Sequence, residues 1–199
     1  MEKTHSLRGA ITAADKTFLK RQILTVSIYL SSYWLPELDS AKVCQREISE
    51  KERFLLEIEE SLTRTLTNKA KVEISVRLLA QEERSHLESY EIARLGHTDK
   101  YFFREIYLES AIEPLVLARS ITLGRSQTAD MLGRLGTNPL GTLLFNSTDW
   151  DFSPSRLKLE TVRGIFGRST HWRNRHTNES LVVQEFFLPA LLKSDFLDP

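Results

Sequence analysis

Hydrophobic and polar residues alternate in several short runs of this chain, and this period of two is what most constrains its fold. The clearest run is 71–78, where Val72, Ile74, Val76 and Leu78 alternate with polar residues. Such alternation is typical of a strand with one buried face. Further strand-like runs are 101–109, 114–123, 156–162 and 181–188. Because short turns rather than long helices separate most of them, we expect one antiparallel sheet.

Helical spacing occurs in two places. Between 46 and 66, apolar residues recur mostly every three or four positions, and Ser49 with Glu52 matches a capping box near the start. A shorter helix is predicted over 128–135. We expect 81–97 to be a loop or to hold a short strand, and 138–141 to be a turn. A few helices covering a face of an antiparallel sheet make an α+β fold.

Charge and composition limit the classes of partner. The chain has 199 residues, with 27 lysines and arginines against 27 aspartates and glutamates. The net charge of zero gives no overall attraction to nucleic acid or to an anionic membrane. The longest apolar-leaning run, 23–35, is shorter than the roughly 20 residues of a membrane span and is expected to be a buried strand or helix. A single cysteine, Cys44, precludes an intramolecular disulfide and suits a reducing cytoplasm.

Three strand-like runs each carry one charged residue in the middle of their apolar face. Residues two apart in a strand share a face, and this rule singles out Arg104, Arg119 and Glu185. An unpaired buried charge is costly, so each of them needs a partner. One interpretation is a structural ion pair, for example between Arg104 and Glu185.

The other interpretation is a binding pocket. Two arginines against one glutamate leave a positive interior, and arginine suits bidentate binding of a carboxylate. Apolar walls with a few convergent polar groups are usual for small-molecule sites. The pattern therefore favours a small carboxylate with an apolar ring or stem as ligand.

Other candidate sites are weaker. The histidines show no metal-ligand spacing, so we expect no metal site. The segment 164–180 is rich in glycine and arginine and is interpreted as a hairpin or loop. We expect its arginines, Arg168, Arg173 and Arg175, to face solvent. The chain has no serine in a GxSxG context, and no glycine-rich phosphate-binding loop.

Six segments, in order, resemble the motifs of a known family, the chorismate pyruvate-lyases. Any one of these segments is weak, but six in order over one domain are specific. The segments are Glu60-Ser61-Leu62-Thr63, Phe103-Arg104-Glu105-Ile106, Ala118-Arg119-Ser120, Leu135-Gly136-Thr137-Asn138-Pro139-Leu140-Gly141, Gly164-Ile165-Phe166-Gly167-Arg168 and Glu185-Phe186-Phe187-Leu188-Pro189.

The resemblance implies a fold and a site. The family has an antiparallel sheet with helices packed on one side and helical flaps over a buried ligand pocket. It would make 46–199 the chorismate lyase-like domain and 1–45 an N-terminal extension. At the matched positions, Arg104 would bind the ring carboxylate and Arg119 would be the second cation. Glu185 would face the 4-hydroxyl end, and Leu62 and Leu140 would add backbone groups and apolar walls.

The resemblance also implies an activity. The family eliminates pyruvate from chorismate to give 4-hydroxybenzoate, a precursor in ubiquinone, plastoquinone or other phenolic biosynthesis, and it needs neither a metal nor an organic cofactor. Arg104 and Glu185 would be the catalytic residues. The same fold also forms the effector-sensing half of some bacterial transcription regulators, so the alternative is a non-catalytic domain that binds a small aromatic acid.

Overall fold

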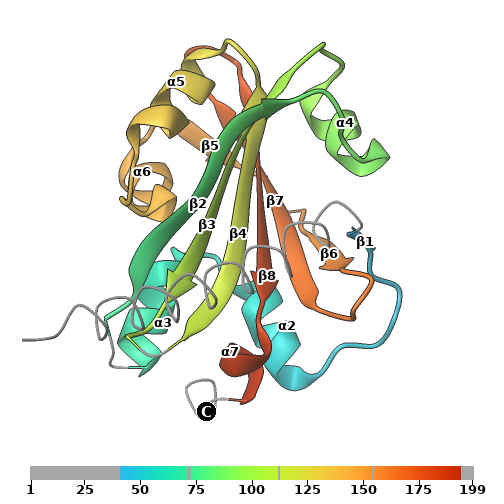
Figure 1. Ribbon diagram of the computed structural model, residues 1–199, viewed down its shortest axis with the longest axis vertical. Helices are drawn as coiled ribbons and strands as arrows, with labels where there is room; N and C mark the ends of the chain where they lie inside the picture. Colours follow the sequence, from blue (N-terminus) through green and yellow to red (C-terminus); the bar gives the residue numbers. More distant parts are fainter. Residues whose placement is uncertain (1–40, 71–72, 112, 154, 194–199) are drawn as a thin grey trace, which may run out of the picture. The chain divides into compact units, whose positions relative to one another are not determined.

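The alternating runs form one antiparallel sheet, with strands in the order β1-β6-β7-β8-β4-β3-β2 and β5 paired with β7 (Figure 1). The computed structural model describes residues 41–193 apart from 71, 72, 112 and 154. Most of the expected extension 1–45, including 23–35, therefore lies outside the described residues. The strands are β1 (Lys42–Val43), β2 (Ser75–Arg84), β3 (Tyr101–Glu109), β4 (Pro114–Leu123), β5 (Trp150–Phe152), β6 (Leu157–Glu160), β7 (Phe166–Asn174) and β8 (Ser180–Phe187).

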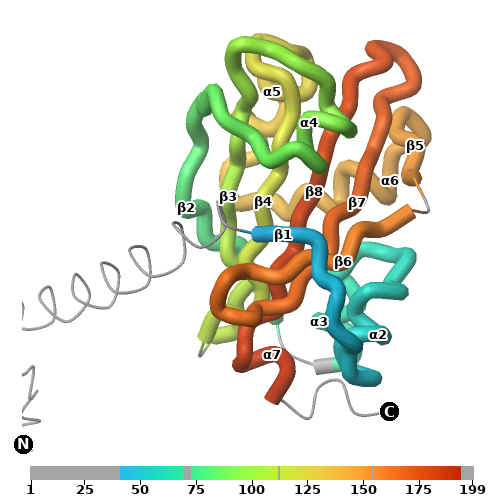
Figure 2. Tube along the Cα trace, turned by 90° about the vertical axis from the view of Figure 1, so that its right-hand side faces the viewer, coloured from blue at the N-terminus to red at the C-terminus, as the bar shows by residue number. Residues whose placement is uncertain are grey.

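The predicted α+β class and antiparallel sheet are confirmed. β3 and β4 begin and end where the sequence pattern places them. β6 and β5 follow one another along β7, so that β7 has partners over most of its length (Figure 2). β1 pairs with β6, which brings Lys42 and Val43 of the expected extension into the sheet.

The helices of the described residues are short. They are α2 (Glu50–Glu57), α3 (Leu62–Ala70), α4 (Ser89–Leu95), α5 (Gln127–Arg134), α6 (Leu140–Asn146) and α7 (Pro189–Lys193). None of the helices in the described part of the chain is long and apolar enough to cross a membrane.

The helix expected over 46–66 is two helices with a break between them. The capping box of Ser49 and Glu52 is present at the start of α2. α2 ends at Glu57 and α3 begins at Leu62. The apolar period continues across the break because residues from both helices belong to one core cluster, which includes Leu55 and Leu66.

Two segments differ from their predicted conformation. The segment 81–97 contains the end of β2 and helix α4, which buries only Glu91 and Leu95 and so has little apolar signal. The expected turn 138–141 runs into α6, which starts at Leu140 directly after Pro139. Proline is well tolerated at a helix start, since it lacks the amide hydrogen that a helix interior requires.

The two faces of the sheet carry different helices. Cross-strand register places Arg104 opposite Ser120, Ala118 opposite Glu185, and Arg168 opposite Glu185, so these side chains share one face, here called the pocket face. The helices α2, α3, α5 and α6 pack against it. α4 packs on the other face, the α4 face, where Glu91 accepts a hydrogen bond from Gln184. Most of these helices thus lie on the pocket face, and α4 lies on the other.

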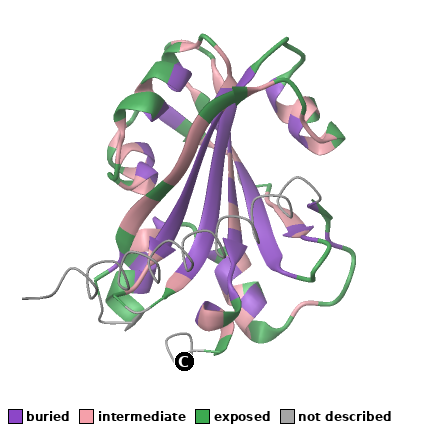
Figure 3. Ribbon diagram, viewed as in Figure 1, coloured by how far each residue is buried: buried purple, intermediate pink, exposed green. Residues whose placement is uncertain are grey.

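The central strands are buried over nearly their whole length (Figure 3). On the pocket face the core divides into two clusters. One contains Leu62 and Ile106 with α2 and α3, and the other contains Leu140, Leu144 and Trp172 with α5 and α6. Apolar side chains from both clusters surround the region between them. The charged residues of the pocket face, Arg104, Arg168 and Glu185, lie in this region.

Candidate functional site

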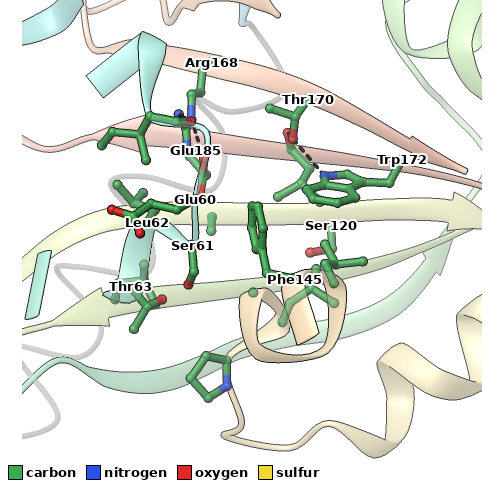
Figure 4. A pocket seen from close by; sticks show the side chains of 18 of the residues that line it. Glu60, Ser61, Leu62, Thr63, Ser120, Phe145, Arg168, Thr170, Trp172 and Glu185 are labelled. Atoms are coloured by element: carbon green, nitrogen blue, oxygen red, sulfur yellow. Dashed lines mark hydrogen bonds and ion pairs between the residues drawn. The ribbon is translucent and has the colours of Figure 1, made fainter. Parts of the chain in front are cut away.

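A cavity lies on the pocket face between the two core clusters (Figure 4). The cavity volume is about 60 Å³, several times what one water needs. Most of its wall is apolar. The polar and charged lining residues are Glu60, Ser61, Thr63, Arg104, Ser120, Arg168, Thr170 and Glu185.

Arg104 is the unusual cation of this cavity. It is only 1% exposed, and its Nη2 donates to the carbonyl oxygens of Gly136 at 2.8 Å and Asn138 at 3.1 Å. Within the described residues, its Nε and Nη1 have no hydrogen-bond partner. Burial lowers the pKa of Arg104 below its usual value, as expected of a cation without a nearby anion. Two buried donors on a charged group are therefore left for a ligand.

Glu185 and Arg168 form the second charged group of the cavity. Arg168 Nε donates to Glu185 Oε2 at 2.6 Å, and the Arg168 side chain is 4% exposed against 13% for Glu185 (Figure 4). Arg168 Nη1 also donates to the carbonyl oxygens of Leu55 and Ile58. The two charges offset each other, so Arg104 supplies the positive charge that remains uncompensated.

One end of the cavity is aromatic. Phe145 meets the edge of Trp172 with ring centroids 5.0 Å apart and an interplanar angle of 85°, and Phe152 lies 4.7 Å from the same ring. Trp172 Nε1 donates to Thr170 Oγ1, which donates to the carbonyl of Val183. The indole and hydroxyl groups are thus satisfied within the wall, and rings on several sides suit a flat ligand.

Two helix starts cover the cavity and correspond to the expected flaps. Leu62 at the start of α3 and Leu140 at the start of α6 both line it and are nearly buried. The two starts touch, because a Cβ on Gly141 would lie 2.7 Å from Ser61 Oγ. Only glycine at 141 allows this approach without a shift of Ser61.

Four of the five residues singled out from the sequence line this cavity: Arg104, Glu185, Leu62 and Leu140. Arg119 does not, and its expected place as second cation of the pocket is wrong. Cross-strand register sets Ser120, not Arg119, beside Arg104, so Arg119 lies on the α4 face. There it is 2% exposed and donates through Nε to Glu105 Oε1 at 2.9 Å.

The second cation of the cavity is Arg168, and the prediction that it faces solvent in a loop is wrong. It belongs to β7 and is buried. A signal was present, because Phe166, Arg168, Thr170 and Trp172 alternate as they would on one face of a strand. Arg175 does face solvent, where it pairs with Asp151.

Arg104 and Glu185 do not form the structural ion pair that is the alternative interpretation. Glu185 is paired with Arg168 rather than with Arg104. The hydrogen bonds of Arg104 go to backbone carbonyls. Of these two residues, Glu185 is neutralised by Arg168, while Arg104 lacks an anion among the described residues.

Comparison with solved structures finds matches of low sequence identity. PhnF from Mycobacterium smegmatis superposes with a TM-score of 0.44 at 10% identity, covering 92% of this chain and 87% of that one. A GntR-family regulator from Enterococcus faecalis gives a TM-score of 0.38 at 10% identity, covering 60% of this chain and 97% of that one.

Sequence comparison gives a narrower relationship. A protein of Marinobacter nauticus named "Probable chorismate pyruvate-lyase" is 30% identical over 175 residues, which cover 82% of this chain and 89% of the relative. The chorismate pyruvate-lyase of Citrobacter koseri is 30% identical over 138 residues, covering 67% and 79%. The sequence model of the family described as chorismate lyase matches residues 40–195. The chain therefore belongs to the chorismate lyase family.

Proposed function

We propose that this protein is a chorismate pyruvate-lyase, which eliminates pyruvate from chorismate and releases 4-hydroxybenzoate. Family membership and the names of its relatives support the reaction class. One structural observation carries the assignment: in an apolar, partly aromatic cavity, Arg104 holds two buried donors without a partner among the described residues. A ring carboxylate satisfies both donors, and the ring fits the aromatic walls.

The reaction has a simple balance. The bond between C3 of the ring and the ether oxygen breaks, C4 loses its hydrogen, and the ring becomes aromatic. The enolpyruvyl group leaves and takes up a proton to become pyruvate. Because aromatisation supplies driving force, we propose that the task of the protein is to hold the substrate in a reactive conformation without a cofactor.

The cavity suggests a role for each residue. Arg104 binds the ring carboxylate, while Leu62 and Leu140 contribute backbone groups and apolar walls. Glu185 either accepts the C4 proton or orients the 4-hydroxyl group. Arg168 replaces Arg119 as the second cation near the substrate, since Arg119 lies on the other face of the sheet.

Turnover of chorismate tests the proposal. Purified protein with chorismate should give equal amounts of 4-hydroxybenzoate and pyruvate, and EDTA should leave the rate unchanged. Arg77→Gln is a suitable control, because Arg77 pairs with Glu109 away from the cavity. Isochorismate or prephenate as product, or activity lost on chelation, would contradict the proposal.

A binding function without catalysis is the second candidate. The observation that favours it is the close pairing of Glu185 with Arg168, since the carboxylate oxygen that accepts from Arg168 is already occupied by a protein donor. Such a protein would bind 4-hydroxybenzoate and leave chorismate intact. The same turnover assay, combined with calorimetry of 4-hydroxybenzoate binding, separates the two candidates.

We also propose that the product feeds quinone or other phenolic biosynthesis in the cytoplasm. A 4-hydroxylated aromatic acid already has the ring and the phenol oxygen of a quinone head group. A strain without the gene should then need added 4-hydroxybenzoate to make its quinone. Normal quinone content without the supplement would contradict this role.

A further inference from the structure

Arg168 is in contact with both the charged group of the cavity and the backbone that covers it. In the sheet, Arg168 of β7 lies directly opposite Glu185 of β8. A Cβ on the neighbouring Gly167 would lie 2.7 Å from the carbonyl oxygen of Glu185, so only glycine fits there without a shift. The guanidinium of Arg168 reaches Glu185 Oε2 through Nε at 2.6 Å.

The same guanidinium holds the end of α2. Arg168 Nη1 donates to the carbonyl oxygens of Leu55 at 2.8 Å and Ile58 at 2.9 Å. α2 has no basic residue of its own in its last turn. Arg168 therefore supplies the cation that the carbonyl end of a helix favours. The chain that follows Ile58 leads to Glu60, Ser61 and Leu62, which line the cavity.

The two oxygens of Glu185 consequently differ. Oε2 accepts from Arg168, whereas no hydrogen bond from any described residue reaches Oε1. Glu185 lines the cavity, so a free acceptor oxygen remains there for a ligand. A fixed carboxylate with one free oxygen is arranged to accept one hydrogen bond from a ligand hydroxyl.

We propose that Arg168 is a positioning residue, which fixes Glu185 so that its free oxygen accepts the hydrogen bond of the ligand's 4-hydroxyl group. This inference rests on the proposed function for the identity of the ligand. Arg168 acts through Glu185 and, by holding the end of α2, keeps the covering chain against the same ligand. It therefore determines specificity for a hydroxylated ring rather than affinity for the carboxylate, which belongs to Arg104.

The ratio of two dissociation constants tests the inference. Benzoate lacks the 4-hydroxyl group, so its dissociation constant divided by that of 4-hydroxybenzoate measures the hydroxyl contact alone. A hydrogen bond to a charged group predicts a ratio of about 10 to 100 for the unmodified protein. Calorimetry should show the ratio falling to within about threefold of unity in Arg168→Gln and in Glu185→Gln.

Three further variants separate positioning from a general loss of structure. The double variant Arg168→Gln with Glu185→Gln should be no worse than either single variant, because both remove one contact. Arg168→Lys keeps the charge but not the fork of donors, and should recover part of the ratio. Arg119→Gln removes a cation from a buried ion pair on the α4 face, and should lower the melting temperature while leaving the ratio unchanged.

Several results would overturn the inference. One is an unchanged or raised ratio in Arg168→Gln. Another is a double variant in which the effects of the two single substitutions on the ratio multiply. A third is an unmodified protein that binds benzoate and 4-hydroxybenzoate equally well. The proposed function fails separately, if the unmodified protein shows the expected ratio and its dependence on Arg168 but makes no pyruvate from chorismate. In that case Arg168 still positions Glu185, in a binding protein.

Discussion

At the scale of single residues, the cavity separates two kinds of buried charge. Arg168 and Glu185 neutralise each other across neighbouring strands. Arg104 has hydrogen bonds to two carbonyls and retains two donors without a partner among the described residues. A buried cation of the second kind is costly until an anion binds, which is the property expected of a ligand-binding group.

The variant Glu185→Gln distinguishes the possible roles of this carboxylate. The amide keeps the size of the side chain but loses its negative charge and cannot act as a base. If Glu185 accepts the C4 proton, turnover should fall by roughly 10²- to 10⁴-fold, which is the usual contribution of general base catalysis. The affinity for chorismate should fall by no more than the roughly 10- to 100-fold that the contact with the 4-hydroxyl group supplies, because the ring carboxylate stays bound to Arg104.

The competing roles give other results in the same variant. A small loss of turnover would mean that Glu185 only orients the hydroxyl group. Because Glu185 is the partner of Arg168, the variant also leaves a buried guanidinium without its anion, and its melting temperature should fall. Unchanged turnover, affinity and melting temperature together would remove Glu185 from the site.

At the scale of elements, the cavity depends on the contact between the starts of α3 and α6. Ser61 and Gly141 meet where a Cβ on Gly141 would lie 2.7 Å from Ser61 Oγ and 3.3 Å from Ser61 Cβ. In Gly141→Ala one helix start must move, at a cost of about 1–3 kcal/mol for overpacking. We expect a lower melting temperature and weaker binding of 4-hydroxybenzoate.

Gly133→Ala is the matched control for this prediction. Gly133 lies within α5, and its added Cβ would meet only Phe102 Cζ at an ordinary 3.9 Å. Alanine is favoured over glycine inside a helix by up to about 1 kcal/mol, so this variant should be as stable as the parent or more so. Equal behaviour of the two variants in melting and binding would refute the importance of the contact at Gly141.

The sequence predicts the bounds of strands, which depend on a local pattern. It does not predict which side chains of different strands share a face, because that depends on how the strands pair. The alternation in 101–109 and 114–123 sets the bounds of β3 and β4. Alternation also shows which residues of one strand share a face, but only register shows which faces of two strands coincide. Arg104 and Arg119 each fit an apolar face, yet pairing of Arg104 with Ser120 puts them on opposite sides.

Arg168 and α4 were missed for related reasons. Most residues of β7 are glycine or polar, so the strand has a weak hydrophobic signal in the sequence. Its apolar residues Phe166 and Trp172 are nevertheless buried. α4 is short, and it meets the sheet through one buried apolar residue, Leu95, and through the polar contact between Glu91 and Gln184. Patterns of hydrophobic residues do not report such contacts, which depend on the assembled sheet.

At the scale of the whole described unit, one sheet separates two buried charge systems. The pocket face holds Arg104, Arg168 and Glu185. The α4 face holds Arg119 bound to Glu105, which also accepts hydrogen bonds from Arg84. The charges of the α4 face are paired with one another within the protein, whereas Arg104 on the pocket face keeps unpaired donors. A carboxylate ligand should therefore stabilise the fold by binding on the pocket face.

Thermal melting with 4-hydroxybenzoate checks this expectation. A ligand that binds only the folded state stabilises it by about 2.7 kcal/mol at a hundred times its dissociation constant. For a chain of this size, that corresponds to a rise in melting temperature of roughly 5–10 °C. Cyclohexanol, which has a ring and a hydroxyl but no carboxylate, should give no comparable rise, and an equal effect of both compounds would contradict a site built around Arg104.

The most direct measurement is the affinity of 4-hydroxybenzoate for Arg104→Ala, compared by calorimetry with the parent and with Arg77→Ala, which removes an arginine outside the cavity. A charge-assisted hydrogen bond contributes roughly 1.5–3 kcal/mol, and a bidentate pair more. The expected result is a loss of about ten- to several-hundred-fold in affinity for Arg104→Ala, in a protein that still melts cooperatively, and no loss for Arg77→Ala. Unchanged affinity in folded Arg104→Ala would show that the carboxylate binds elsewhere, and would contradict the assignment of this cavity as the site.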